Sequence, residues 1–154
     1  MDFLTTEEVE ALLAAPDLAR WEGRRDQALF LLAIQTGLRL SELVGLNRDH
    51  VQLASGSHVR CLGKGRKERC VPLTSRTVAV LSQWLRERQG QGVDPVFPTR
   101  TGRRLSADAV QRRLTLYAAE AAKNTPSLAR KHLTPHVLRH YGEYRCRTPN
   151  NSPT

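Results

Sequence analysis

Three short segments of the chain carry basic side chains at positions where they could bind a phosphate. In the first, Gly37 ends an apolar stretch, Arg39 follows two residues later, and Glu42 stands three residues beyond it. A guanidinium in a tight connection beside the start of a helix favours an anion, because the unpaired backbone N–H groups there attract negative charge. The alternative is a local ion pair in which Glu42 and Arg39 brace two helices.

The second segment is a basic run that contains glycine, residues 63–69, with the sequence GKGRKER. A turn of this kind can reach into a DNA groove, or it can place one ammonium against a leaving oxygen. An ordinary solvated turn is the alternative. The spacing differs from that of a P-loop, so the segment does not indicate nucleotide hydrolysis.

The third segment contains His136 and Arg139, which share one face of a helix because they are three residues apart. His132, His136 and His140 recur every four residues, a spacing that could suggest metal ligands. Pro135 interrupts the helix before His136, and no carboxylate or cysteine stands nearby, so we expect no metal. For His136 alone, the alternative is a core or capping histidine.

The elements that must position these segments are mainly helical. Capping residues and apolar spacing predict helices over about 6–15, 22–36, 41–46, 75–89 and 106–122, with another beginning near residue 135 behind Thr134. Ser41 is the expected N-cap of the third helix. Residues 58–62 and 69–73 predict a β-hairpin, in which Cys61 lies opposite Cys70 if residues 65 and 66 form the turn. The fold class is therefore mainly α with a small antiparallel sheet (α+β).

Composition and charge indicate an anionic partner. The 154 residues are 40% apolar, enough for one domain with a core, and the formal net charge is +9. Of the 24 basic residues, 20 are arginine and 4 are lysine. Arginine binds phosphate bidentately, so nucleic acid is the natural partner, and a solvated basic surface is the alternative.

Several other classes of protein are disfavoured. No apolar run approaches the ~20 residues that a membrane span needs, and the first residues do not resemble a signal peptide. Three cysteines without CxxC spacing argue against a disulfide framework and a cysteine-rich zinc site. We therefore expect a cytoplasmic protein with reduced thiols and no membrane, metal or cofactor.

The order of the three basic segments is more specific than any one of them. Together GLRxSEL, GKGxKER and TPHxLRH resemble the active-site series of the tyrosine recombinases, the group that includes phage integrases. The resemblance covers residues 4–141. It implies the recombinase catalytic-domain fold, with double-stranded DNA and other recombinase protomers as partners. Family members cut one DNA strand with a tyrosine, form a 3′-phosphotyrosyl bond and rejoin the strand without a metal.

The resemblance also implies a role for each matching residue. Arg39 and Arg139 would clamp the scissile phosphate, and Lys64 would protonate the 5′-oxygen leaving group. His136 would bind the phosphate or assist proton transfer, and Glu42 would orient the first arginine. The other basic residues of the hairpin would contact DNA: Arg66, Lys67 and Arg69.

The chain departs from the family pattern after Arg139. Only 15 residues follow it (154 − 139), too few for two further helices of ~11–12 residues and the tyrosine that the family carries there. Tyr141 and Tyr144 stand too close to Arg139 to serve, and Tyr117 belongs to an apolar helix face. We expect an incomplete catalytic domain over residues 1–141 and an irregular tail over residues 142–154.

The sequence therefore predicts a DNA-binding fragment of a site-specific recombinase or integrase from a mobile element, inactive by itself. Two alternatives stay open. The chain could use a tyrosine from a partner chain, or it could be a non-catalytic DNA-binding regulator. In the last case, contacts to phosphates alone would make binding sensitive to salt and poorly specific for sequence.

Overall fold

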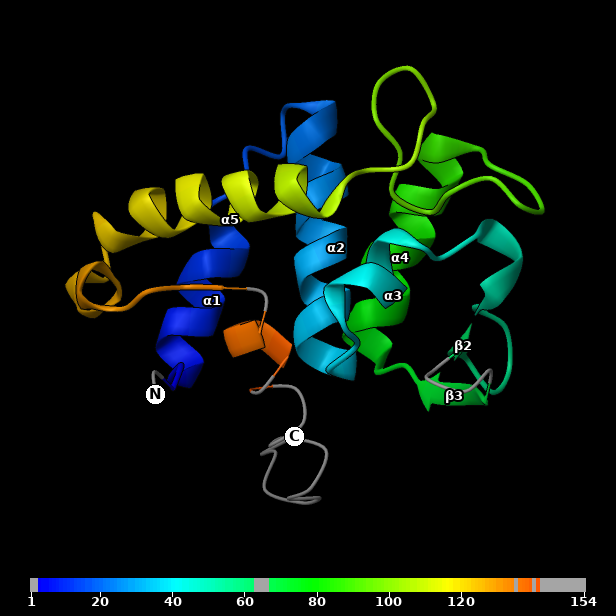
Figure 1. Ribbon diagram of the computed structural model, residues 1–154, viewed down its shortest axis with the longest axis horizontal. Helices are drawn as coiled ribbons and strands as arrows, with labels where there is room; N and C mark the ends of the chain where they lie inside the picture. Colours follow the sequence, from blue (N-terminus) through cyan, green and yellow to red (C-terminus); the bar gives the residue numbers. More distant parts are fainter. Residues whose placement is uncertain (1–2, 63–66, 135, 140, 142–154) are drawn as a thin grey trace.

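A computed structural model describes residues 3–62, 67–134, 136–139 and 141, and it has the mainly helical fold with a small antiparallel sheet that the sequence predicts (Figure 1). The α-helices are α1 (Thr6–Ala14), α2 (Trp21–Thr36), α3 (Leu40–Val44), α4 (Ser75–Arg88) and α5 (Ala107–Ala122). Two 3-10 turns, η1 (Arg48–His50) and η3 (Pro126–Arg130), and the strands β1 (Val51–Gln52), β2 (His58–Leu62) and β3 (Glu68–Pro72) complete the described elements.

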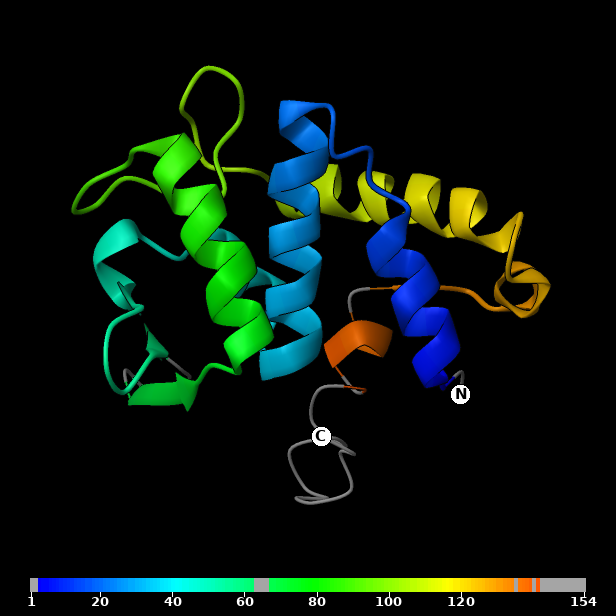
Figure 2. The same ribbon diagram turned by 180° about the vertical axis from the view of Figure 1, so that it is seen from behind.

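Helix α2 is the central element of the core, as its nearly continuous apolar surface predicts. It stands between α1 and α4, and α5 crosses it on the side seen in Figure 1 (Figures 1 and 2). Leu29 and Leu32 are almost completely buried. Fully burying one such side chain stabilises the fold by about 1.5–3 kcal/mol. Gly37 ends the helix in the left-handed region, at φ 70°, a conformation that glycine adopts without steric cost.

Most of the predicted helix starts are confirmed by capping hydrogen bonds in the structure. The Thr5 hydroxyl accepts a hydrogen bond from the Glu8 N–H, and the Glu8 carboxylate accepts one from the Thr5 N–H, so the capping box is present. Ser106, at the predicted start of α5, caps the helix by accepting a hydrogen bond from the Ala109 N–H. The expected cap at Ser41 is wrong. Helix α3 begins at Leu40 with Arg39 as its N-cap residue, because the carboxylate at position 42 bonds back to the Arg39 N–H.

The predicted hairpin is confirmed, but its expected register is wrong by one residue. Strands β2 and β3 pair antiparallel, with Cys61 opposite Arg69 and Arg60 opposite Cys70. The last pair joins Leu62 to Glu68, so five residues connect the strands. A turn at residues 65 and 66 would require an even number of connecting residues. Because side chains alternate along a strand, this one-residue shift puts Cys61 and Cys70 on opposite faces of the hairpin. Cys61 is buried and Cys70 is exposed.

The last described segment is helical at residues 136–139 and 141, as predicted, and lies between α1 and α2 in both views (Figures 1 and 2). Thr134 caps it by accepting a hydrogen bond from the Val137 N–H at 3.3 Å. Leu138 anchors the segment in the core, where it is 2% exposed. Pro135 and the expected tail over residues 142–154 lie outside the described residues.

Candidate active site

Arg39 stands at the N-terminus of α3 on a backbone that is held on both sides. Leu38 before it is 1% exposed and Leu43 after it is 2% exposed, while Arg39 itself is exposed. The Arg39 N–H donates to Glu42 Oε1 at 2.8 Å. Within the part of the chain that the structure describes, no carboxylate pairs with the Arg39 guanidinium. A rigid backbone therefore presents this charge to solvent, where it can bind an anion.

Arg139 comes from the last described segment and meets the same turn. Its Nε donates to the carbonyl oxygen of Gly37 at 3.1 Å, although the two residues are 102 positions apart in the sequence. Gly37 lies two residues before Arg39, so the two arginines predicted to bind phosphate converge where α2 gives way to α3. Arg139 is half-buried, because Leu138 beside it packs into the core.

His136 lies on the same helical segment as Arg139, three residues before it, and its side chain is exposed. Residues at this spacing project from one face of a helix. The exposure is contrary to the alternative of a core histidine. His136 and Arg139 can therefore approach a ligand from the same side.

Glu42 has a different partner from the one the sequence suggested. Its Oε1 and Oε2 accept hydrogen bonds from Arg69 Nη2 at 3.2 and 3.3 Å, and its side chain is 10% exposed. The ion pair of Glu42 is with Arg69 and not with Arg39, which contradicts the alternative of a local pair. Glu42 does contact Arg39, but through the Arg39 backbone N–H and not through the guanidinium.

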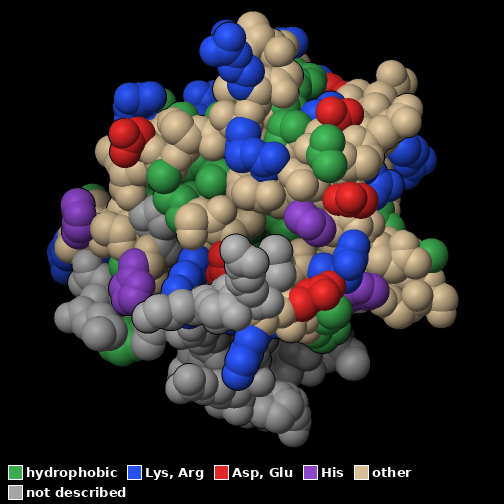
Figure 3. All heavy atoms as spheres, turned by 45° about the vertical axis from the view of Figure 1, so that its right-hand side comes forward, with side chains coloured by type: hydrophobic (Ala, Val, Ile, Leu, Met, Phe, Trp, Pro, Cys, Tyr) green, Lys and Arg blue, Asp and Glu red, His purple; other side chains and the backbone are tan. Residues whose placement is uncertain are grey.

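The basic hairpin contributes two further residues to the described structure. Lys67 is exposed just before β3, and Arg69 lies within β3 against Glu42. Lys64 and Arg66 lie outside the described residues. Figure 3 brings forward the right-hand side of Figure 1, and carboxylates lie among the basic side chains and histidines that it shows there.

Nothing among the described residues suggests a resident metal or a membrane span. No group of three or more His, Cys, Asp or Glu side chains in that part of the chain is arranged to hold a metal ion. The helices described there are too short or too polar to cross a bilayer.

The sequence analysis missed a buried ionic cluster beside α2. Asp26, 2% exposed, accepts hydrogen bonds from Arg25 Nε at 2.9 Å, from Arg113 Nε and from the Tyr117 hydroxyl. Arg25 Nη1 also donates to the Pro98 carbonyl oxygen at 3.0 Å. The only signal in the sequence was an Arg-Asp pair inside an apolar helix. The cluster joins α2 to α5 and to the loop between α4 and α5.

Tyr117 is engaged in this cluster and in the core, as its apolar helix face predicted. Its ring packs edge-on against Phe30 with centroids 5.7 Å apart. Burial, followed by the hydrogen bond to Asp26 and its charge, raises the pKa of the Tyr117 hydroxyl above its ordinary value. The hydroxyl therefore stays protonated at neutral pH and donates to a buried carboxylate.

Comparisons with known proteins identify the family of this chain. The model of the phage integrase family matches residues 2–145. The putative integrase/recombinase y4rC of Sinorhizobium fredii is 51% identical over 140 residues, which make up 91% of this chain and 42% of that protein. The chain thus spans less than half the length of this relative.

Two solved structures have the same fold. The XerA recombinase superposes with a TM-score of 0.79 at 24% identity, over 98% of this chain and 51% of that one. The XerH site-specific recombinase bound to its difH substrate gives a TM-score of 0.75 at 24% identity, over 96% and 44% of the two chains. Since the family model spans nearly the whole sequence, this protein belongs to the phage integrase family.

Proposed function

We propose that this chain is part of the catalytic domain of a site-specific tyrosine recombinase and that it holds a phosphate of double-stranded DNA between Arg39 and Arg139. The observation that carries the proposal is the hydrogen bond from Arg139 to Gly37, which brings the second arginine to the turn that holds the first. Two neighbouring guanidiniums can neutralise the negative charge on the non-bridging oxygens of a phosphate. The XerH structure, solved with its DNA substrate, supports DNA as the ligand.

The other residues take roles around that phosphate. In cleavage by a recombinase of this type, a tyrosine oxygen bonds to phosphorus, the bond to the 5′-oxygen breaks, and that oxygen takes up a proton. We assign the proton donor to Lys64 and a hydrogen bond to the phosphate to His136. Arg66 and Lys67 contact the DNA backbone beside the site. Because the proposed ligand is DNA, we place the protein in the cytoplasm, as the sequence predicts.

We further propose that the 154-residue chain binds DNA but does not cleave it alone. The Tyr117 hydroxyl is held by the buried Asp26. Tyr141 is two residues from Arg139 on a helical segment, and residues at that spacing do not face the same side. Tyr144 lies outside the described residues and, five positions after Arg139, is close to it in sequence. A tyrosine from another recombinase protomer would complete the site, which is one of the alternatives that the sequence leaves open.

The phosphate site is tested with Arg39→Ala and Arg139→Ala. Each variant should bind a DNA duplex roughly tenfold more weakly, because a charged hydrogen bond is lost. Each should also lower the slope of log K against log salt by about 0.9, the value for one phosphate contact. Arg86→Ala removes the same charge from α4, which carries none of the candidate residues, and is the matched control. If all three variants behave alike, the site is wrongly assigned.

Cleavage is tested with a nicked duplex and denaturing electrophoresis for a covalent protein–DNA adduct. No adduct should form with this chain alone. An adduct that appears only when a tyrosine-bearing recombinase is added would support sharing of the site between chains. An adduct formed by this chain alone would show that one of its own tyrosines is the nucleophile.

A further inference from the structure

We propose that Arg69 is a positioning residue that holds Arg39 in place through Glu42, and that it does not itself contact DNA. The proposal rests on the proposed function, in which Arg39 binds a phosphate. It assigns Arg69 a different role from the other basic residues of the hairpin.

The Glu42 carboxylate joins the two arginines. Its Oε1 accepts both the Arg39 N–H at 2.8 Å and Arg69 Nη2 at 3.2 Å, and its Oε2 accepts Arg69 Nη2 at 3.3 Å. The Glu42 side chain is 10% exposed, whereas that of Arg69 is 48% exposed. A carboxylate withdrawn this far from water requires a charged partner, and the only ion pair recorded for Glu42 among the described residues is the one with Arg69.

Helix α3 depends on this carboxylate more than a long helix would. It has five residues, and a helix of that length is not stable by its own hydrogen bonds. The first N–H groups of a helix lack internal partners, and Glu42 satisfies the one at Arg39. If Arg69 is removed, the carboxylate should turn toward water and release the Arg39 backbone.

Arg69 is well placed to act as a fixed partner. It is the second residue of β3, a strand that is paired along its whole length with β2, so its backbone is held by the sheet. Its direct neighbour across the hairpin, Cys61, is buried. Arg69 thus lies on the face of the hairpin that is turned toward the protein, not on the face that carries the exposed Cys70.

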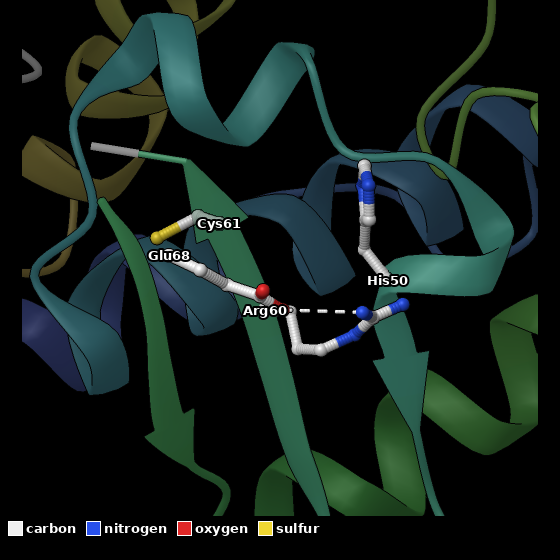
Figure 4. A pocket seen from close by; sticks show the side chains of 4 residues that line it. All are labelled: His50, Arg60, Cys61 and Glu68. Carbon is white, nitrogen blue, oxygen red and sulfur yellow. Dashed lines mark hydrogen bonds and ion pairs between the residues drawn. The ribbon is translucent and has the colours of Figure 1, made fainter. Parts of the chain in front are cut away.

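Arg60 in the same hairpin provides a matched control. Its side chain is 43% exposed, close to the value for Arg69, and it pairs with Glu68 at 3.1 Å. Its Nη2 donates to the Asp49 carbonyl oxygen at 3.0 Å. Figure 4 shows Arg60 linked to Glu68 beside His50, in a pocket that does not include Glu42 or Arg39. Arg60→Ala therefore removes the same charge from the hairpin and leaves the link to Arg39 intact.

The first experiment uses no DNA. In the ¹⁵N-labelled full chain, Arg69→Ala should shift the amide signal of Arg39 and raise its hydrogen-exchange rate severalfold, whereas Arg60→Ala should change neither. If the shift and the exchange rate of the Arg39 amide are the same in Arg69→Ala as in Arg60→Ala, the proposal is overturned. Arg69→Met, which keeps the apolar stem of the side chain, replaces Arg69→Ala if the alanine variant does not fold.

The second experiment is a double-mutant cycle on DNA affinity. Arg69→Ala should weaken binding by nearly as much as Arg39→Ala, and the double variant should be no weaker than Arg39→Ala alone. The salt slope should be equal in all three variants. Losses that multiply, with a slope that falls by about 0.9 for each arginine, would identify Arg69 as a DNA contact and overturn the proposal. An affinity unchanged by Arg69→Ala would also overturn it.

The two experiments separate the two proposals. If the unaltered chain does not bind DNA, the proposed function fails, and the amide measurement still shows whether Arg69 controls Arg39.

Discussion

At the scale of the residue, Arg39 and Arg139 are held in different ways. Arg39 is fixed through its backbone, and its guanidinium is exposed. Arg139 is fixed through its guanidinium, because Nε is bound to the Gly37 carbonyl oxygen. A lysine ammonium lacks this planar fork of donors and cannot be held in the same geometry.

This difference predicts unequal effects of lysine at the two positions. Arg139→Lys should weaken DNA binding roughly tenfold, because one ammonium cannot bond to Gly37 and hold the phosphate in a fixed geometry as well. Arg39→Lys should weaken binding less, since it keeps the charge on an intact backbone. Fluorescence anisotropy with a labelled duplex measures both. Equal losses, or a larger loss for Arg39→Lys, would contradict this account of how the two residues are held.

At the scale of the element, buried charges join helices that are distant in sequence. Glu8 on α1 is 1% exposed and accepts hydrogen bonds from Ser127 in η3 at 2.7 Å and from Lys131 just after it. Asp26 joins α2 to α5. These contacts hold the elements around the segment that carries Arg139, so they stabilise the site without touching it.

The contact between α1 and η3 predicts acid sensitivity. Burial opposes the ionisation of Glu8, but the hydrogen bonds from Lys131, Thr5 and Ser127, with the charge of Lys131, together lower its pKa from 4.5 to about 2. The ionised carboxylate therefore stabilises the folded state above the ordinary pKa, and this contribution is lost as pH falls from about 4.5 toward 2.

Glu8→Gln should lower the free energy of unfolding at neutral pH by about 2 kcal/mol, since bonds to a charged group become neutral. It should also weaken the dependence of stability on pH between 4.5 and 2. Urea unfolding at a series of pH values measures both effects. A variant as acid-sensitive as the unaltered chain would show that other groups cause the sensitivity.

Loss of the contact between α2 and α5 should destabilise the fold more than the Glu8→Gln change does. Asp26→Asn should lower the free energy of unfolding by about 3 kcal/mol, because it leaves Arg25, 4% exposed, without an ionised partner. The matched control is Glu10→Gln, the same acid-to-amide change in an exposed pair with Arg76, which should cost less than about 1 kcal/mol. Equal unfolding midpoints for the two variants in urea would mean that the buried cluster does not stabilise the fold.

At the scale of the whole molecule, the 24 basic residues overstate the number of DNA contacts that the proposed function predicts. Many arginines are already paired with carboxylates, as Arg24 is with Glu87 and Arg76 is with Glu10. Figure 3 likewise shows carboxylates among the basic side chains on the face that it brings forward. The salt dependence of binding follows the number of phosphates contacted and not the net charge.

We therefore expect a moderate salt dependence for the unaltered chain. The assigned basic residues are five: Arg39, Lys64, Arg66, Lys67 and Arg139. At about 0.9 for each contact, the slope of log K against log salt should be about −4 to −5. A salt titration of duplex binding measures it. A slope near −8 would indicate that nearly the whole net charge takes part, and a slope near zero would exclude phosphate contacts.

Much of this structure follows from short-range patterns in the sequence. Helix ends are set by contacts within three or four residues, which sequence patterns can predict. Examples are the capping box of Thr5 and Glu8, the N-cap at Ser106 and the C-cap at Gly37. The order of the three basic segments was enough to indicate the family. The hairpin was predictable in kind but not in register, because its register depends on the length of the connection and on which face is buried.

Only the tertiary structure decided which residues meet at the site. The sequence paired Glu42 with its near neighbour Arg39, whereas its ion pair is with Arg69, 27 residues away on a strand. The Asp26 cluster and the bond from Arg139 to Gly37 span 87 to 102 residues. Such contacts form only when the helices and the sheet pack together. The sequence contains many arginines that could pair chemically with each carboxylate, and only packing brings one of them within reach. The sequence by itself determined most helix ends and the order of the basic segments, and packing brought Arg139 to the turn that precedes Arg39.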